Sequence, residues 1–302
     1  MIECPVCQSN RIRQASGKEN GKIQYQCRDC HEKNEGGGYF SKAYEGAKIL
    51  VFDIETSPIK AYVWRAWKQN VYMDQIIDDW FMLTWSAKWL NHPEMLSEAI
   101  TPKEAKNHDD KRIVKKLWKL FNEADILIAH HGRKFDIPKS KQRFVLNGLK
   151  PNSPYQIIDT KELAKREFDF THNKLDYIAQ IFGMKRKKPT DFQLWVDCMK
   201  GDKKALDYML KYNEEDVLIL EEVYLGLRGW MKSHPNLGLY TLDEESMCPT
   251  CGDKKLKWIG EYYTQLNRYD SYQCGSCGSI NKSKQSNLTT NKKKYLLKSN
   301  AR

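Results

Sequence analysis

Four carboxylates stand where a purely structural chain has little use for charge. Asp53 and Glu55 lie two residues apart in the apolar run KILVFDIETS, so in a strand both side chains project from the same face. Asp136 follows a second apolar run, and Asp216 lies in a segment of helical character. A buried ionised carboxylate is costly unless a positive group compensates it. A cluster of four therefore requires cations, and carboxylate oxygens in this number suit Mg²⁺ or Mn²⁺.

Two such ions held side by side can support phosphodiester hydrolysis. One ion, about 3.5–4 Å from the other, lowers the pKa of an attacking water, and the second stabilises the leaving oxygen in an in-line attack. Tyr212 lies four residues before Asp216, one helical turn away on the same face. Taken singly, each acid fits a helix cap or a surface position as well. The metal site therefore depends on the joint convergence of these residues.

The elements that must position these residues lie between 47 and 242, the range we expect for the central domain. Continuous apolar runs predict strands at 47–56, 80–90, 126–131 and 154–160. Apolar residues at helical spacing predict helices at 111–125, 136–149, 161–168, 174–184 and 203–231. Strands that come first, a helix that crosses between them and a helical C-terminal half indicate an α/β fold with a sheet packed by helices.

Eight of the nine cysteines form four Cys-x-x-Cys pairs near the two ends of the sequence, and Cys198 is left over as an expected core residue. In a cytosolic chain this pairing indicates metal rather than disulfides. Two pairs give the tetrahedral four-sulfur shell that structural zinc prefers, and segments this short need the metal to fold. We therefore expect two structural Zn²⁺ ions, one in a ribbon at 1–35 with ligands Cys4, Cys7, Cys27 and Cys30, and one in a ribbon at 243–281 with ligands Cys248, Cys251, Cys274 and Cys277.

The ribbons suit either nucleic-acid contact or protein docking. The first resembles the zinc ribbons of transposase-associated DNA-binding proteins, and it carries basic residues that could track phosphates, which are Arg11, Arg13, Lys18, Lys22 and Arg28. The second carries aromatic residues that could stack bases or form a small core, which are Trp258, Tyr262, Tyr263, Tyr269 and Tyr272. A flexible linker at 36–46 is expected after the first ribbon.

Charge and hydropathy limit the function classes. The formal net charge is +11, and the stretch from Asn281 to Arg302 holds seven Lys or Arg and no acid. We expect 282–302 to be a disordered basic tail that binds polyanions or aids solubility. No apolar run is long enough to cross a bilayer, no basic-then-apolar signal pattern begins the sequence, and no GxxxxGK[ST] phosphate loop occurs. We expect a cytoplasmic protein that uses neither a membrane nor ATP.

Three segments in order, FDIET, HHGRKFD and YNEED, resemble the three motifs of the DEDD superfamily of ribonuclease-H-like 3′–5′ exonucleases. The resemblance covers the central domain. This domain is similar to the YprB type and to the proofreading domains of family B polymerases, and it includes segments similar to those of phage versions. It implies a ribonuclease-H-like mixed sheet between the two ribbons. It also implies that Asp53, Glu55, Asp136 and Asp216 bind two Mg²⁺ or Mn²⁺ ions and that Tyr212 orients the attacking water. Families with a catalytic His place it where this chain has Lys211, so the resemblance is to the tyrosine subtype.

One position departs from the resemblance. His131 stands where the relatives place Asn, a residue that helps to position the substrate strand. A His can still donate one hydrogen bond. Because its ring titrates at about pH 6.5, the positioning of the substrate strand would depend on pH. Further basic residues are candidates for contact with the phosphates of the substrate. Together with His131 the expected substrate-binding residues are Arg133, Lys134, Lys185, Arg186, Lys187 and Lys188.

The leading hypothesis is a metal-dependent 3′–5′ exonuclease on single-stranded or frayed DNA, with ribbons that recruit nucleic acid or a replication or recombination protein. A second hypothesis is RNA trimming or structure-specific endonuclease cleavage on the same fold, since motif spacing does not distinguish the two sugars. A third is a non-catalytic nucleic-acid-binding adaptor that acts through its ribbons. The adaptor would be favoured if one of the four acids were missing, and all four are present.

Overall fold

The computed structural model of the 302-residue chain describes residues 12–19, 22–29, 39–42, 46–184, 189–241 and 243–298. The chain divides into two compact units. One unit is Lys48–Tyr224, and the other consists of Met1–Ala47 together with Leu225–Arg302. The larger unit lies within the predicted central domain, 47–242. Across the described residues, no helix combines the length and apolar character needed to span a membrane.

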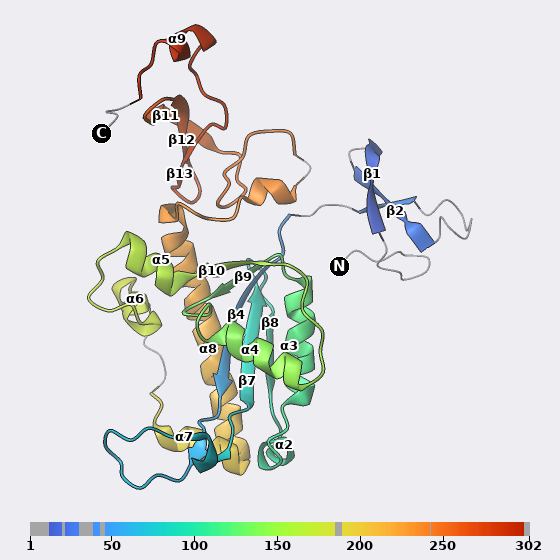
Figure 1. The fold of residues 1–302 in the computed structure, drawn as a ribbon, viewed down its shortest axis with the longest axis vertical. Coiled ribbons are helices and arrows are strands. Elements are labelled where there is room, and N and C mark those ends of the chain that lie inside the picture. The colour runs from blue at the N-terminus through green and yellow to red at the C-terminus, as the bar shows by residue number, and fades with distance from the viewer. Residues whose placement is uncertain are drawn as a thin grey trace. The chain divides into compact units, whose positions relative to one another are not determined.

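A five-stranded mixed sheet in the order β10-β9-β4-β7-β8 forms the centre of the larger unit (Figure 1). Its strands are β4 (Ile49–Thr56), β7 (Met82–Trp89), β8 (Met95–Ala99), β9 (Ile126–Ala129) and β10 (Gln156–Asp159). β4, β7 and β8 run antiparallel, whereas β9 is parallel to both β4 and β10. β4 is therefore the central strand, and its length places both of its acids inside the sheet.

One face of the sheet packs on α3 (Lys111–Glu123) and α4 (Asp136–Leu146), which lie in front of it in Figure 1. The apolar residues of α3 recur at helical spacing, and those facing the sheet are buried. Phe121 of α3 contacts Phe52 of β4 edge-on, with ring centroids 4.8 Å apart, and Phe144 of α4 at 5.6 Å. The apolar side of β4 is thus fixed in the core, so its alternate residues face the other way.

The opposite face is covered by α8 (Lys203–Leu227), a 25-residue helix that runs behind the sheet in Figure 1. Lys88 Nζ of β7 forms a buried ion pair with Glu221 Oε2 at 2.5 Å. Ser97 Oγ of β8 donates a hydrogen bond to Glu214 Oε1 at 2.6 Å. These two polar contacts, in addition to apolar packing, determine the position of α8 along the acid-bearing face.

The remaining elements of this unit surround the two layers. They are β5 (Lys60–Ala61), η1 (Met73–Gln75), β6 (Ile76–Asp78), α2 (Pro102–Lys106), α5 (Thr160–Glu167), α6 (Leu175–Ile181) and α7 (Phe192–Lys200). β5 and β6 pair as a two-stranded ribbon. The strands and helices predicted in the central domain are confirmed, whereas β8, α2 and α7 were not predicted. β8 escaped prediction because all five of its residues are only half-buried.

The smaller unit contains two antiparallel three-stranded sheets. One consists of β1 (Ile12–Glu19), β2 (Lys22–Cys27) and β3 (Tyr39–Lys42), and the other of β11 (Leu256–Tyr263), β12 (Arg268–Cys274) and β13 (Ile280–Lys282). Its described residues also include the short helices η2 (Arg228–Trp230), η3 (Leu237–Tyr240) and α9 (Thr290–Lys294).

Two segments of this unit that the sequence predicts as linker and tail contain short elements of secondary structure. The predicted flexible linker, 36–46, contains β3. This strand pairs with β2 and supplies hydrogen-bond partners to the edge of β2 opposite β1. The predicted disordered tail, 282–302, contains α9, because Thr289 Oγ1 accepts a hydrogen bond from Lys292 N at 3.2 Å and caps the helix.

Candidate active site and metal centres

Three of the four predicted acids meet on the face of the sheet that α8 covers. Asp53 and Glu55 project from β4, and Asp216 reaches them from the middle of α8. One carboxylate oxygen from each residue lies within 4.8 Å of the other two. Asp216 is buried, while Asp53 and Glu55 are half-buried. Three hard oxygen donors this close are suited to a divalent cation such as Mg²⁺ or Mn²⁺.

Tyr212 and Asn213 join the same cluster from the preceding turn of α8. Burial, followed by the negative charges of the three acids, raises the pKa of Tyr212, whose hydroxyl hydrogen-bonds to Asp216. Asn213 is fully buried, and its Nδ2 donates a hydrogen bond to Asp53 Oδ2 at 2.6 Å. Asn213 was not predicted as a site residue, although its position three residues before Asp216 places it on the same helix face.

Asp136, the fourth predicted acid, adjoins this cluster without entering the group of three. It is the first residue of α4, and its Oδ1 accepts a 3.4 Å hydrogen bond from the backbone N–H of Ile54, the residue between the two β4 acids. Burial, with a smaller contribution from the charge of Asp159, raises the pKa of Asp136 to about 7. A buried carboxyl favours its proton unless a cation compensates its charge, which is compatible with a metal-binding site.

The turn between β9 and α4 is held by Asp159, a second residue that the sequence analysis missed. Asp159 ends β10 and caps α5, and its carboxylate accepts hydrogen bonds from the backbone N–H groups of His131 (2.9 Å) and Arg133 (3.1 Å). An Asp immediately before a helical segment is a typical N-cap signal. His131 adopts a φ of +75° in this turn, so Asp159 stabilises an unusual backbone conformation just before Asp136.

The predicted substrate-binding residues are placed differently from one another. His131 is half-buried, and burial followed by the charge of Lys161 lowers its pKa, so its ring is neutral at neutral pH. Arg133 is exposed but engaged, since its Nη2 donates to Ile157 O at 2.5 Å and its Nε lies 3.2 Å from Glu162 Oε2. Lys134 is exposed. The other four predicted residues, Lys185, Arg186, Lys187 and Lys188, lie outside the described residues.

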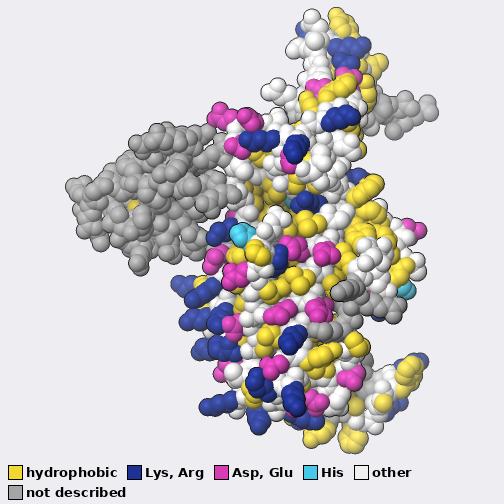
Figure 2. Space-filling view, turned by 180° about the vertical axis from the view of Figure 1, so that it is seen from behind, with side chains coloured by type: hydrophobic (Ala, Val, Ile, Leu, Met, Phe, Trp, Pro, Cys, Tyr) yellow, Lys and Arg dark blue, Asp and Glu magenta, His cyan; other side chains and the backbone are white. Residues whose placement is uncertain are grey.

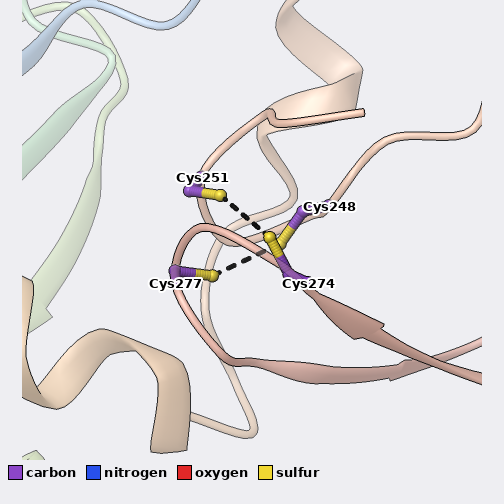
Figure 3. Close-up of side chains that lie close together, drawn as sticks. All are labelled: Cys248, Cys251, Cys274 and Cys277. Atoms are coloured by element: carbon purple, nitrogen blue, oxygen red, sulfur yellow. Dashed lines mark hydrogen bonds between the residues drawn. The ribbon is translucent and has the colours of Figure 1, made fainter. Parts of the chain in front are cut away.

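The second set of cysteines forms a compact four-sulfur group (Figure 3). Cys248 and Cys251 precede β11, whereas Cys274 ends β12 and Cys277 follows it in the next turn. Cys248 Sγ lies 3.6 Å from Cys277 Sγ, and Cys251 Sγ lies 3.5 Å from Cys274 Sγ. A tetrahedral zinc site with Zn–S bonds of about 2.3 Å has sulfur–sulfur edges of about 3.8 Å. These residues therefore fit a structural Zn²⁺.

One of these thiols, Cys248, has a lowered pKa, whereas burial raises the pKa of Cys251 and of Cys277. Burial acts to raise the pKa of Cys248, but hydrogen bonds from the Ser279 side chain and from backbone groups outweigh it and lower that pKa to about 7. The thiolate is the form that binds metal. In contrast, burial raises the pKa of Cys198 to about 12, as expected for the inert core residue that the sequence predicts. Of the first predicted ribbon, Cys27 is buried, and Cys4, Cys7 and Cys30 lie outside the described residues.

A mixed five-stranded sheet with its acids on the central strand and on a covering helix is a ribonuclease-H-like fold, as the sequence predicted. Residues 94–227 match the RNase_H_2 family model, which is described as the RNase_H superfamily. The match includes Asp136, Tyr212 and Asp216 and begins after Asp53 and Glu55. No curated protein matches the chain. The fold and the match point in general terms to a nuclease, and ribonuclease-H-like nucleases use divalent metals.

Proposed function

We propose that this protein is a 3′–5′ exonuclease that uses two divalent metal ions to hydrolyse single-stranded or frayed DNA. The observation that carries the proposal is the convergence of Asp53, Glu55 and Asp216 within 4.8 Å, although the first and last are far apart in the sequence. A structural helix packing on a sheet has no need of three acids at its contact. The superfamily match over residues 94–227 supports the same assignment.

Each residue has a defined task in this proposal. Asp53, Glu55 and Asp216 hold the ions, with Asp136 beside them. Such ions supply, when bound, a water of lowered pKa and charge stabilisation for the leaving oxygen of a phosphodiester. The raised pKa of Tyr212 keeps its hydroxyl protonated, so it orients groups through its hydrogen bond and does not act as the base.

In the proposal the ribbons contribute binding to nucleic acid or to a replication or recombination protein. On the second ribbon, Trp258 and Tyr263 are exposed, which supports base stacking over a small core. Lys282 Nζ lies 5.1 Å and 4.7 Å from the ring centroids of Tyr262 and Tyr269, so a cation accompanies the aromatic surface. The four-cysteine group fits a Zn²⁺ that holds this surface together.

Incubation of end-labelled DNA and RNA, single-stranded and duplex, with the protein and Mg²⁺ or Mn²⁺ tests the proposal. A ladder that shortens from the 3′ end of single-stranded DNA supports it. Preferred digestion of RNA, or internal fragments, would instead indicate RNA trimming or endonuclease cleavage. No product with either metal would leave a nucleic-acid-binding adaptor and refute the proposal.

A matched pair of variants on α8 links any cleavage to the acid cluster. Asp216→Ala should lower the rate at least about 1,000-fold, because bound metal contributes several kcal/mol of transition-state stabilisation. Glu222→Ala removes an exposed acid from the same helix and should leave the rate unchanged. Equal rates for the two variants would exclude the cluster as the active site.

A further inference from the structure

Residues 62–73, which we call the aromatic loop, expose large apolar side chains that the acid cluster does not use. The loop connects β5 to η1 and includes Trp64 (93% exposed), Trp67 (77%), Tyr62 (76%) and Tyr72 (65%). Exposure of one such ring is ordinary, but several on one short loop indicate a binding surface.

The charges of the aromatic loop are of one sign. Its charged residues are Arg65 and Lys68, both exposed, and it contains no Asp or Glu. Figure 2 shows Lys or Arg side chains beside hydrophobic ones at the lower right margin, where this loop lies. Aromatic rings with interspersed cations and no acids are complementary to a polyanion that carries stackable bases.

The two ends of the aromatic loop are fixed to each other by the ribbon of β5 and β6. Lys60 and Ala61 of β5 pair with Asp78 and Ile76 of β6, and Tyr62 N donates a hydrogen bond to Gln75 O at 3.0 Å. Tyr72 N donates to Gln75 Oε1 at 2.8 Å. The rings are therefore presented on an anchored hairpin, which reduces the entropy lost when a ligand binds them.

The segment that connects β4, the acid-bearing strand, to β5 lines a cleft. Thr56, the last residue of β4 and the next after Glu55, lines one side of a cleft of about 390 Å³ that continues through Ile59 to the start of β5. Trp80 and Trp195 line the same cleft, and Lys139 Nζ lies 3.7 Å from the centroid of the Trp80 ring. A volume of this order accommodates a nucleotide-sized group.

We propose that the aromatic loop is a stacking platform for unpaired bases of a single nucleic-acid strand whose end passes through this cleft to the acid cluster. The identity of the ligand rests on the proposed function, whereas the binding surface itself does not. Stacking on aromatic rings tolerates any base sequence, and the two cations contact the backbone phosphates. The platform would therefore favour unpaired strands over blunt duplex, in which the bases are already stacked.

The test measures binding of the full-length protein to a labelled oligothymidylate of about 20 nucleotides with phosphorothioate linkages, which resist hydrolysis, by fluorescence anisotropy. Trp64→Ala combined with Trp67→Ala should weaken binding at least about 30-fold, since each stacked base contributes about 1–3 kcal/mol. Trp230→Ala removes another exposed tryptophan, outside the loop, and should leave the affinity unchanged. Equal affinity of the double variant and the unsubstituted protein would overturn the proposal.

A second pair of substitutions separates charge from stacking. Arg65→Glu combined with Lys68→Glu keeps the aromatic rings and should weaken oligothymidylate binding. The slope of log affinity against log salt concentration should fall by about 1.4 in magnitude, as expected when two phosphate contacts on a single strand are lost. An unchanged slope would overturn the assignment of these cations to the phosphates. The tryptophan double variant could instead lose binding to anionic phospholipid vesicles and keep its full affinity for oligothymidylate. That result would overturn the proposal and assign the loop to a membrane surface.

A small substrate distinguishes failure of this inference from failure of the proposed function. The p-nitrophenyl ester of thymidine 5′-monophosphate reaches the acid cluster without spanning the loop, so the tryptophan double variant should hydrolyse it at the unsubstituted rate. The unsubstituted protein could fail to hydrolyse the ester and still bind oligothymidylate through Trp64 and Trp67. That result would refute the proposed nuclease function and support the stacking platform. If the tryptophan double variant lost ester hydrolysis to the same extent as oligothymidylate affinity, the aromatic loop would not be a binding surface separate from the acid cluster.

Discussion

At the scale of single residues, the acid cluster depends on a neutral amide as much as on its charges. Asn213 Nδ2 holds Asp53 Oδ2 at 2.6 Å from within the core. An amide can donate this hydrogen bond without adding charge, whereas a lysine at the same point would compete with a metal ion. Asn213 therefore orients Asp53 while leaving the negative charge of the site intact.

Asn213→Ala should raise the Mg²⁺ concentration needed for half-maximal cleavage by about 10–100-fold, the usual effect of removing a residue that orients a metal ligand. The rate at saturating Mg²⁺ should recover most of its original value, because the acids remain. Metal titration of the cleavage rate provides the measurement. A lower rate at saturation with no change in the Mg²⁺ requirement would show that Asn213 does not act through metal binding.

Asp136 predicts a pH dependence of stability. Burial raises its pKa from 3.8 to about 7, so the folded protein holds a proton that the unfolded chain has released. This contribution to stability is complete below the unfolded pKa, and it is lost as pH rises through about 7. In buffer without Mg²⁺ or Mn²⁺, the Tm should therefore fall as the pH rises from about 4 to about 7, and it should level off above that.

Asp136→Asn removes the titrating carboxyl and should flatten this part of the Tm profile, since the amide does not ionise. Mg²⁺ added at about pH 8 should raise the Tm of the unsubstituted protein more than that of the variant, because binding to the ionised form stabilises the fold. Thermal unfolding followed by circular dichroism measures both effects. Identical pH profiles for the two proteins would show that Asp136 is not the group responsible.

At the scale of elements, the turn between β9 and α4 requires glycine. A Cβ at Gly132 would lie 2.3 Å from Ala129 Cβ, at the end of β9, and 3.7 Å from Asp136 Oδ2. The close approach lets the chain turn sharply enough for Asp136 to begin α4 next to Ile54. The position of the fourth acid thus depends on the absence of one methyl group.

Gly132→Ala should lower the free energy of unfolding by about 1–3 kcal/mol, as overpacking in a filled core does. Urea denaturation gives this value. Combining it with Ala129→Gly removes the methyl group that clashes and should restore a large part of the loss. The double variant could instead lose as much free energy of unfolding as the two single variants together. The contact between positions 129 and 132 would then not be the cause of the destabilisation.

At the scale of the whole molecule, two kinds of metal are expected to serve separate purposes. The four cysteines of the second ribbon have the donor type and spacing of a structural zinc site, while the acid cluster has hard oxygen donors. Each predicted ribbon is too small to fold on apolar burial alone, so we expect zinc to supply folding free energy.

Elemental analysis of the purified protein should find about two zinc ions per chain, one for each four-cysteine set. Cys251→Ser with Cys274→Ser should remove about one of them. Cys198→Ser, in the core of the larger unit, should leave the zinc content unchanged. A protein without zinc would refute the ribbon assignment, and a double variant with full zinc content would refute the ligand set at the second ribbon.

The sequence alone determined the α/β class and the main strands and helices of the central domain. These features follow from local periodicity and residue type, which a single segment of chain carries by itself. The proximity of Tyr212 to Asp216 could also be predicted, since a spacing of four residues places both on one face of a helix.

Only the tertiary structure decided which side chains meet. Contacts between α8 and β4 join residues as distant in the sequence as Asp53 and Asn213, which are 160 positions apart. These contacts depend on strand order and helix placement, which local periodicity does not specify. Asn213 on Asp53, Asp159 at the β9–α4 turn, and Asp136 against the Ile54 backbone all result from that packing. Strand β3 within the predicted linker has the same cause, because an edge strand owes its conformation to the neighbour with which it forms hydrogen bonds.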